Sequence, residues 1–122
     1  MIESTAVSRT RIRQERRYRR FKLKFPVHLL VQYDQGILEL DAISRDVSIG
    51  GLLLDCPALI PPHSPVNFVI SMQSRSLRAL ELVGDGTVVR SGTMTLNGNV
   101  AVALECNSPI AQIESYLADN ST

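Results

Sequence analysis

Apolar and polar residues alternate one by one along most of the chain, and this alternation limits the fold more than any other feature. In VHLLVQY, for example, Val27, Leu29 and Val31 alternate with His28 and Gln32. A period of two puts successive side chains on opposite faces of a β-strand, so that one face is buried. The pattern predicts six strands, over residues 27–33, 38–43, 51–56, 66–72, 77–90 (in two pieces, 77–82 and 87–90) and 100–104. Six short, half-buried strands favour a small all-β domain, either an antiparallel barrel or a sandwich.

The segments between the expected strands carry turn chemistry. In Asp34-Gln35-Gly36, Gly36 is expected to supply the permissive backbone of a turn. SRDVSIGG, residues 44–51, predicts a second turn, and LNGN, residues 96–99, a hairpin turn. PALIPPHSP is expected to be a loop, because proline removes the donors of a β-ladder. Gly84-Asp85-Gly86 predicts a bulge or bend that interrupts the fifth strand.

The period changes at the end of the chain. Ser108 is a good N-cap, and Pro109 is suited to the first position of a helix. Ile110, Ile113 and Leu117 then follow three and four residues apart, which places them on one helical face. A short amphipathic C-terminal helix is therefore expected to pack against the end of the barrel.

Length and composition favour one globular domain. The chain has 122 residues, of which 44% are hydrophobic. Its first residues contain no apolar core of a secretory signal, and no apolar run approaches the roughly 20 residues that a membrane span needs. These features predict a cytoplasmic protein. Cys56 and Cys106 are far apart and form no CxxC pair, so they are expected to be reduced, buried thiols.

Charge is distributed unevenly along a chain whose net charge is only +1. Residues 9–24 hold nine basic residues and one acidic residue, Glu15, whereas the rest of the chain holds four basic and eleven acidic residues. An arm this basic, beside an acidic body, is suited to capturing an anion. Two simpler alternatives stay open, namely that the arm is solvated or that it docks on its own acidic body.

The sequence contains no recognisable catalytic or metal-binding motif. His28 and His63 are not at a metal-ligand spacing, and both are interpreted as surface histidines. No GxSxG, P-loop or GxGxxG motif is present, and the serines near Asp46 have no histidine nearby to form a triad. We therefore expect no enzymatic activity, no metal and no cofactor.

Two short motifs remain. Arg16 and Arg20 form RxxxR within the basic arm, and DVSIGG, residues 46–51, reads DxSxxG. Taken alone, the first is common in basic tails and the second is compatible with an ordinary turn.

Together and in this order, the two motifs resemble those of a PilZ domain, a bacterial receptor module for cyclic di-GMP. ERRYRRF followed by FPVHL is similar to the arm and first strand of that family, and SRDVSIGGLLL to its second motif and third strand. GTVVR and NVAVAL resemble later strands, so the resemblance covers residues 14–106. It implies a six-stranded antiparallel β-barrel with a flexible basic N-terminal arm and a short C-terminal helix. The expected division is a flexible tail (1–15), a barrel domain with the RxxxR arm (16–106) and a helix with its tail (107–122).

The resemblance also implies a ligand site for cyclic di-GMP. Guanidinium groups bind phosphate oxygens and guanine edges, and a carboxylate accepts hydrogen bonds from guanine N–H groups. Arg13 and Arg17 form a second RxxxR, but Arg16 and Arg20 are the preferred pair, because Phe21 and then Pro26-Val27 follow Arg20 in a way that resembles the family. In the family that the chain resembles, an arginine directly before the first motif can favour binding of two stacked ligand molecules. This chain has Glu15 at that position, which favours one ligand molecule per site. The expected ligand-binding residues are Arg16, Arg17, Arg20, Asp46, Ser48, Gly50 and Gly51.

The expected function is that of a cyclic di-GMP receptor, in which the ligand orders the arginine arm and changes the interaction with a downstream protein. The first alternative is a PilZ-like adaptor that binds proteins but no nucleotide. Nucleic-acid binding is not expected, because the chain has no Trp, only three Phe and three Tyr, and a pI near 7.8. Only the basic arm favours contact with anionic lipid. The oligomeric state, monomer or weak dimer, the identity of the partner and the regulated process stay open.

Overall fold

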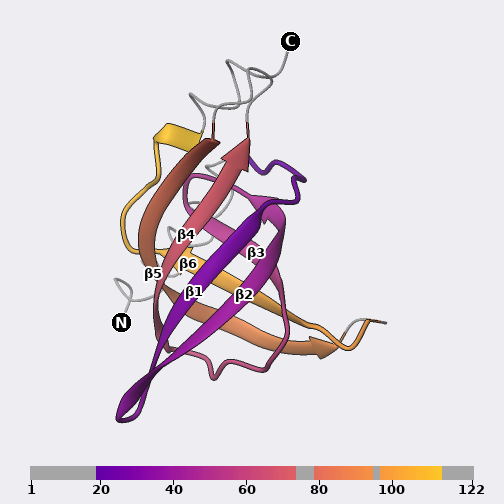
Figure 1. Cartoon of the computed structure of the whole chain (residues 1–122), viewed down its shortest axis with the longest axis vertical. Coiled ribbons are helices and arrows are strands. Elements are labelled where there is room, and N and C mark those ends of the chain that lie inside the picture. The colour runs from indigo at the N-terminus through magenta and orange to yellow at the C-terminus, as the bar shows by residue number, and fades with distance from the viewer. Residues whose placement is uncertain (1–18, 74–78, 95–96, 114–122) are drawn as a thin grey trace, which may run out of the picture.

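Six antiparallel strands close into a barrel in the computed structural model, which describes residues 19–73, 79–94 and 97–113 (Figure 1). Around the barrel the strands follow the order β1-β2-β3-β6-β5-β4. The predicted six-stranded all-β fold is confirmed, and closure means that each strand has two neighbours for at least part of its length. The strands are β1 (Pro26–Tyr33), β2 (Gly36–Val47), β3 (Gly51–Cys56), β4 (Pro65–Gln73), β5 (Ala79–Met94) and β6 (Val100–Cys106).

The alternation seen in the sequence fills the interior of the barrel. In β3, Leu52 and Leu54 are buried, whereas Leu53 between them is only half-buried. Phe68 of β4 is one of the largest fully buried side chains, and its ring lies against Gly84 of β5. A Cβ atom at Gly84 would lie 2.5 Å from the ring, so glycine is required there for the ring to fit.

The turns differ from the expectation in two places. Between β1 and β2, Asp34 takes the positive φ angle of 42°, and Gly36, which was expected to supply this freedom, already pairs with Tyr33. Asp tolerates this conformation better than most residues. The expected turn over residues 44–51 is also too long, because β2 continues to Val47 and only residues 48–50 leave the strands.

β5 is one continuous strand, and the predicted interruption at Gly84-Asp85-Gly86 is wrong. Its pairing with β4 keeps a single register from Pro65↔Thr87 to Gln73↔Ala79. Gly84 makes room for Phe68, and a Cβ atom at Gly86 would lie 2.3 Å from the carbonyl oxygen of Glu105. Both glycines therefore allow close packing. The register shifts of β5 lie further along, on its β6 side.

The chain after β6 packs against the barrel beside the loop between β2 and β3. The Ile110 N–H donates to the Ile49 carbonyl oxygen at 2.9 Å, and Ile110 and Ile113 are both buried in the core. Within the described part, only residues 112 and 113 are helical, so the predicted C-terminal helix is not supported as an element. Leu117 lies outside the described residues. Among the described residues, no helix is long and apolar enough to cross a membrane.

Candidate ligand site on the outer face of the barrel

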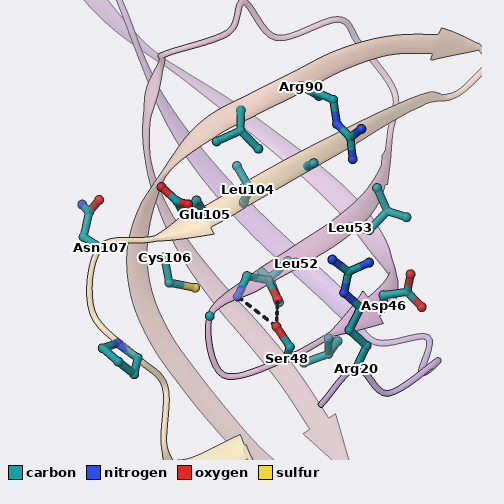
Figure 2. A pocket seen from close by; sticks show the side chains of 16 residues that line it. Arg20, Asp46, Ser48, Leu52, Leu53, Arg90, Leu104, Glu105, Cys106 and Asn107 are labelled. Carbon is teal, nitrogen blue, oxygen red and sulfur yellow. Dashed lines mark hydrogen bonds between the residues drawn. The ribbon is translucent and has the colours of Figure 1, made fainter. Parts of the chain in front are cut away.

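An open pocket of about 470 Å³ lies on the outer face of the barrel, over the end of β2, β3, β6 and β5 (Figure 2). Its volume is within the range of small-molecule sites. Five of the seven predicted site residues line it, namely Arg20, Asp46, Ser48, Gly50 and Gly51. The other two, Arg16 and Arg17, lie outside the described residues, as does Arg13 of the alternative pair.

One lateral row of residues forms the middle of the pocket. Asp46 of β2 pairs with Leu53 of β3, Leu53 pairs with Ala103 of β6, and Ala103 pairs with Arg90 of β5. Neighbouring strands lie about 4.8 Å apart, so this row spans roughly 14 Å. The row therefore has the acidic Asp46 at one end and the basic Arg90 at the other. Between them, Leu53 and Ala103 form an apolar surface on which a flat, uncharged ring could lie.

Two irregularities in the strand pairing turn the side chains of Asp46 and Arg90, at the two ends of this row, toward the outer face. The register of β2 against β3 shifts between Ser44 and Asp46, and that of β5 against β6 shifts between Val88 and Arg90. A bulge adds one residue and reverses the phase of the alternation that follows. Ser44 is therefore buried while Asp46, two residues later, reaches the surface of the pocket.

Main-chain pairing with β2 places Arg20 over the pocket. Phe21 forms an isolated antiparallel bridge with Val47: the Phe21 N–H donates to the Val47 carbonyl at 2.8 Å, and the reverse bond measures 2.9 Å. Arg20 precedes this bridge, so its side chain lies beside Asp46 (Figure 2). The Arg19 guanidinium lies 5.2 Å from the centre of the Phe21 ring and does not line the pocket.

Ser44 fixes the next part of the arm. Its buried hydroxyl donates to the Leu23 carbonyl and accepts the Phe25 N–H at 2.8 Å. The Ser44 N–H also donates to the Phe25 carbonyl at 2.9 Å. Residues 21–25 are therefore bonded to β2.

The serine and the last glycine of the second motif hold a tight turn. The Ser48 N–H donates to the Gly51 carbonyl at 3.0 Å, and the Gly51 N–H donates to the Ser48 hydroxyl at 3.1 Å. The hydroxyl also donates to the Gly51 carbonyl at 3.1 Å (Figure 2). A Cβ atom at Gly51 would lie 2.5 Å from the Leu104 carbonyl oxygen, so glycine is needed for the approach of β3 to β6. Neither Gly50 nor Gly51 has a positive φ angle.

The charged side chains of the pocket make no ion pair with one another. Among the described residues, ion pairs join only His28 to Glu39 and Asp41, and Arg45 to Asp55. Arg20, Arg90 and Asp46 therefore have no ion-pair partner within the described ranges. The pocket is lined by two cations, Arg20 and Arg90, and two acids, Asp46 and Glu105, so it offers separate groups for an anion and for hydrogen-bond donors rather than a net positive charge.

Sequence reasoning did not identify Arg90 or Glu105 as lining residues. Arg90 belongs to GTVVR, which predicted a strand, but its direction depends on the bulge beside it, and alternation alone does not reveal a bulge. Glu105 pairs with Gly51 and adds a negative charge to the pocket. Within the described ranges, no group of three or more His, Cys, Asp or Glu side chains is arranged to hold a metal ion.

Comparison with known proteins identifies the family. The model of the PilZ domain family matches residues 13–119. No curated protein matches the chain. Among solved structures, the chain is similar to the Bacillus subtilis inhibitor of motility (MotI/DgrA), with a TM-score of 0.66 and 15% identity over 86% of this chain and 49% of that one. This chain therefore spans about half the length of MotI/DgrA.

A second similar structure is the PilZ domain of CeSA from a cellulose synthesizing bacterium. The TM-score is 0.51 and the identity 20%, over 84% of this chain and 95% of that one. At these identities, both structures show a shared fold. The family model covers most of the chain, and together with the barrel and the two motifs it shows that this protein belongs to the PilZ domain family.

Proposed function

We propose that this protein is a receptor for cyclic di-GMP and that its pocket on the outer face of β2, β3, β6 and β5 is the ligand site. The observation that carries the proposal is the placement of Arg20 and Asp46, one from each predicted motif, side by side in one pocket. Cyclic di-GMP signalling is the known role of the PilZ family, to which the chain belongs.

The chemistry of the pocket fits the two parts of such a ligand. The guanidinium groups of Arg20 and Arg90 can bind phosphate oxygens or a guanine edge, and the Asp46 carboxylate can accept guanine N–H groups. Leu53 and Ala103 provide an apolar floor for a base. Ser48, Gly50 and Gly51 contribute the turn that shapes the rim, so their role in binding includes positioning.

We further propose that binding orders the part of the arm before Phe21, with Arg16 and Arg17 closing over the ligand. Residues 21–25 are bonded to β2, which supports a change confined to the residues before them. The closed arm would then alter a surface that a downstream protein contacts. The similarity to MotI/DgrA, an inhibitor of motility, supports an effector of this kind without identifying the partner. A cytoplasmic location, where a second messenger acts, belongs to the same proposal.

Calorimetric titration with cyclic di-GMP tests the receptor function, with GTP and cyclic di-AMP as controls. We expect binding of cyclic di-GMP alone, and the titration also gives the number of ligand molecules per site. A folded protein that releases no heat and shows no thermal shift would instead favour the alternative, a PilZ adaptor that binds proteins but no nucleotide.

Alanine variants test the site. Arg16→Ala, Arg20→Ala and Asp46→Ala each remove a charge-assisted hydrogen bond worth about 1.5–3 kcal/mol, so we expect affinity to fall by roughly 10- to 150-fold. Lys24→Ala is the matched control, because Lys24 is an exposed cation of the same arm that does not line the pocket. Unchanged affinity in Arg20→Ala and Asp46→Ala would show that the ligand binds elsewhere.

A further inference from the structure

One edge of the β1–β2 hairpin has no neighbour in the described structure. β2 pairs with β1 from Gly36 to Ile43, but its pairing with β3 begins only at Ile43. Residues 37–42 therefore have β1 on one side and no described strand on the other. No main-chain hydrogen bond joins them to any other described segment. Figure 1 shows this hairpin running beyond the rest of the barrel. An unpaired edge of this kind is a template for another strand.

The side chains along this edge define the strand that would fit it. On the outer face, Ile37 is 66% exposed, and the side chains of Glu39 and Asp41 are 65% and 90% exposed. On the inner face, Leu38 and Leu40 are only partly buried, although they pack against the core. A matching strand needs basic residues on one face and apolar or small residues on the other.

The acids on this edge can accept further hydrogen bonds. His28 takes one oxygen of each: its Nε2 lies 2.7 Å from Oε2 of Glu39, and its Nδ1 lies 2.7 Å from Oδ1 of Asp41. Within the described ranges, no lysine or arginine forms an ion pair with either carboxylate. Two exposed carboxylates two residues apart therefore lie on the outer face of the strand that forms the unpaired edge, and each has one oxygen that is not bonded to His28.

The chain itself contains the complementary pattern, in RTRIR at residues 9–13. If these residues are extended, Arg9, Arg11 and Arg13 would fall on one face of the strand, and Thr10 and Ile12 on the other. We propose that the open edge of β2 over residues 37–41 is a docking edge for residues 9–13 of the same chain. The arginines would lie beside Glu39 and Asp41, and Ile12 would cover Leu38 and Leu40.

The length of the chain permits this docking. Arg20 lies beside Asp46, and β2 between Asp41 and Asp46 covers five residues, or about 17 Å. The seven residues from Arg13 to Arg20 reach at most about 25 Å when extended. Residues 21–25 lie on the β1 side of β2 and the open edge on the β3 side, so the chain must also cross β2, which adds roughly 10 Å sideways and makes the span about 20 Å. Residues 9–13 can therefore lie beside residues 37–41, running in the same direction as β2, while Arg20 keeps its place.

A second copy of the protein fits this edge less well. Antiparallel pairing of two β2 edges about a twofold axis would bring Glu39 and Asp41 of one copy near the same acids of the other. Like charges facing one another across strands are destabilising. The charge of the edge therefore favours the basic segment over self-association. The proposal concerns the protein without ligand and does not depend on cyclic di-GMP binding; if it holds, the part of the arm that the ligand would order is residues 14–20.

Residue-resolved amide hydrogen exchange of the whole chain tests the docking. The comparison is with the triple variant Arg9→Gln, Arg11→Gln, Arg13→Gln, whose changes lie outside the barrel. Two opposite-charge pairs across strands predict exchange about two- to thirtyfold slower in the unaltered protein, at the amides of residues 37–41 that do not bond to β1. Amides of β3 and β6 serve as the internal reference and should exchange equally in both proteins.

A second variant separates strand pairing from simple attraction between charges. Arg11→Ile combined with Ile12→Arg keeps the composition and net charge but breaks the alternation. We expect it to lose the protection as the triple variant does. The proposal would be overturned if residues 37–41 exchanged equally fast in the unaltered protein and the triple variant. It would also be overturned if the double variant Arg11→Ile, Ile12→Arg kept the full protection of these amides. Protection that increases with protein concentration would assign the edge to a second copy and also overturn it.

Discussion

Gly51 shows how a motif residue can serve the fold and the site at once. Its missing side chain allows the Leu104 carbonyl to approach, and its N–H and carbonyl bond to Ser48. The turn that carries the second motif therefore depends on barrel packing. A loss of binding in a Gly51 variant would not by itself identify a ligand contact, because the strands around the pocket would also shift.

We predict that Gly51→Ala lowers the free energy of unfolding by about 1–3 kcal/mol, because the new Cβ would overlap main-chain atoms of β6. Urea denaturation measures this change. Gly36→Ala is the matched control, since a Cβ there meets nothing within 4 Å, and its effect should stay within about 0.5 kcal/mol. Equal stability of the Gly51 variant and the unaltered protein would contradict the packing role.

At the scale of elements, the β1–β2 hairpin carries a titrating group between its two strands. Both ring nitrogens of His28 lie 2.7 Å from carboxylate oxygens, and both can donate only when the ring is protonated. The hydrogen bond to Asp41, followed by that to Glu39, raises the pKa of His28 above its ordinary value of 6.5. The protonated form therefore binds the two strands together on their exposed face.

Because the pKa of His28 is higher in the folded state, its contribution to stability is fully present below pH 6.5 and is lost as the pH rises through the folded-state value. An NMR titration of the imidazole should give a midpoint above 6.5. In Asp41→Asn this midpoint should move down, whereas Asp34→Asn, at the hairpin tip, should leave it in place. A midpoint unaffected by Asp41→Asn would show that the contact has no influence in solution.

The strands were predictable from the sequence, but the direction of the site residues was not. Alternation reveals which face of β1 or β3 is buried, because each inward residue meets the same core. The bulges beside Asp46 and Arg90 depend on how neighbouring strands align, and that alignment is a property of the closed barrel. Asp46 was identified only through its motif, and Arg90, which belongs to neither motif, was missed.

At the scale of the whole molecule, closure of the barrel shields both thiols. Neither cysteine is in a disulfide, in line with the prediction of reduced thiols; Cys56 is buried as predicted, whereas Cys106 is only partly buried. Loss of solvation raises the pKa of each to about 12, with smaller contributions from Asp55 at Cys56 and from Asp85 and Glu105 at Cys106. Almost no thiolate is then present near neutral pH.

We therefore predict that both cysteines of the folded protein react slowly with a thiol-directed disulfide reagent at pH 8. After denaturation, both should react at the rate of a free thiol. Cysteine-to-serine variants, made one at a time, assign each reaction phase to a residue. Cys106 also lines the pocket, so its rapid reaction in the folded state would show that the pocket wall opens more widely than the closed barrel implies.

The bonds from Ser44 to Leu23 and Phe25 also determine how far the rest of the arm can move. With the chain fixed at Phe21, Arg16 is tethered by five residues and stays within about 17 Å of that anchor. A tether this short gives a second binding group an effective concentration in the millimolar range. A ligand held first by Arg20 and Asp46 would meet Arg16 as an intramolecular partner, so even a weak second contact would contribute to avidity.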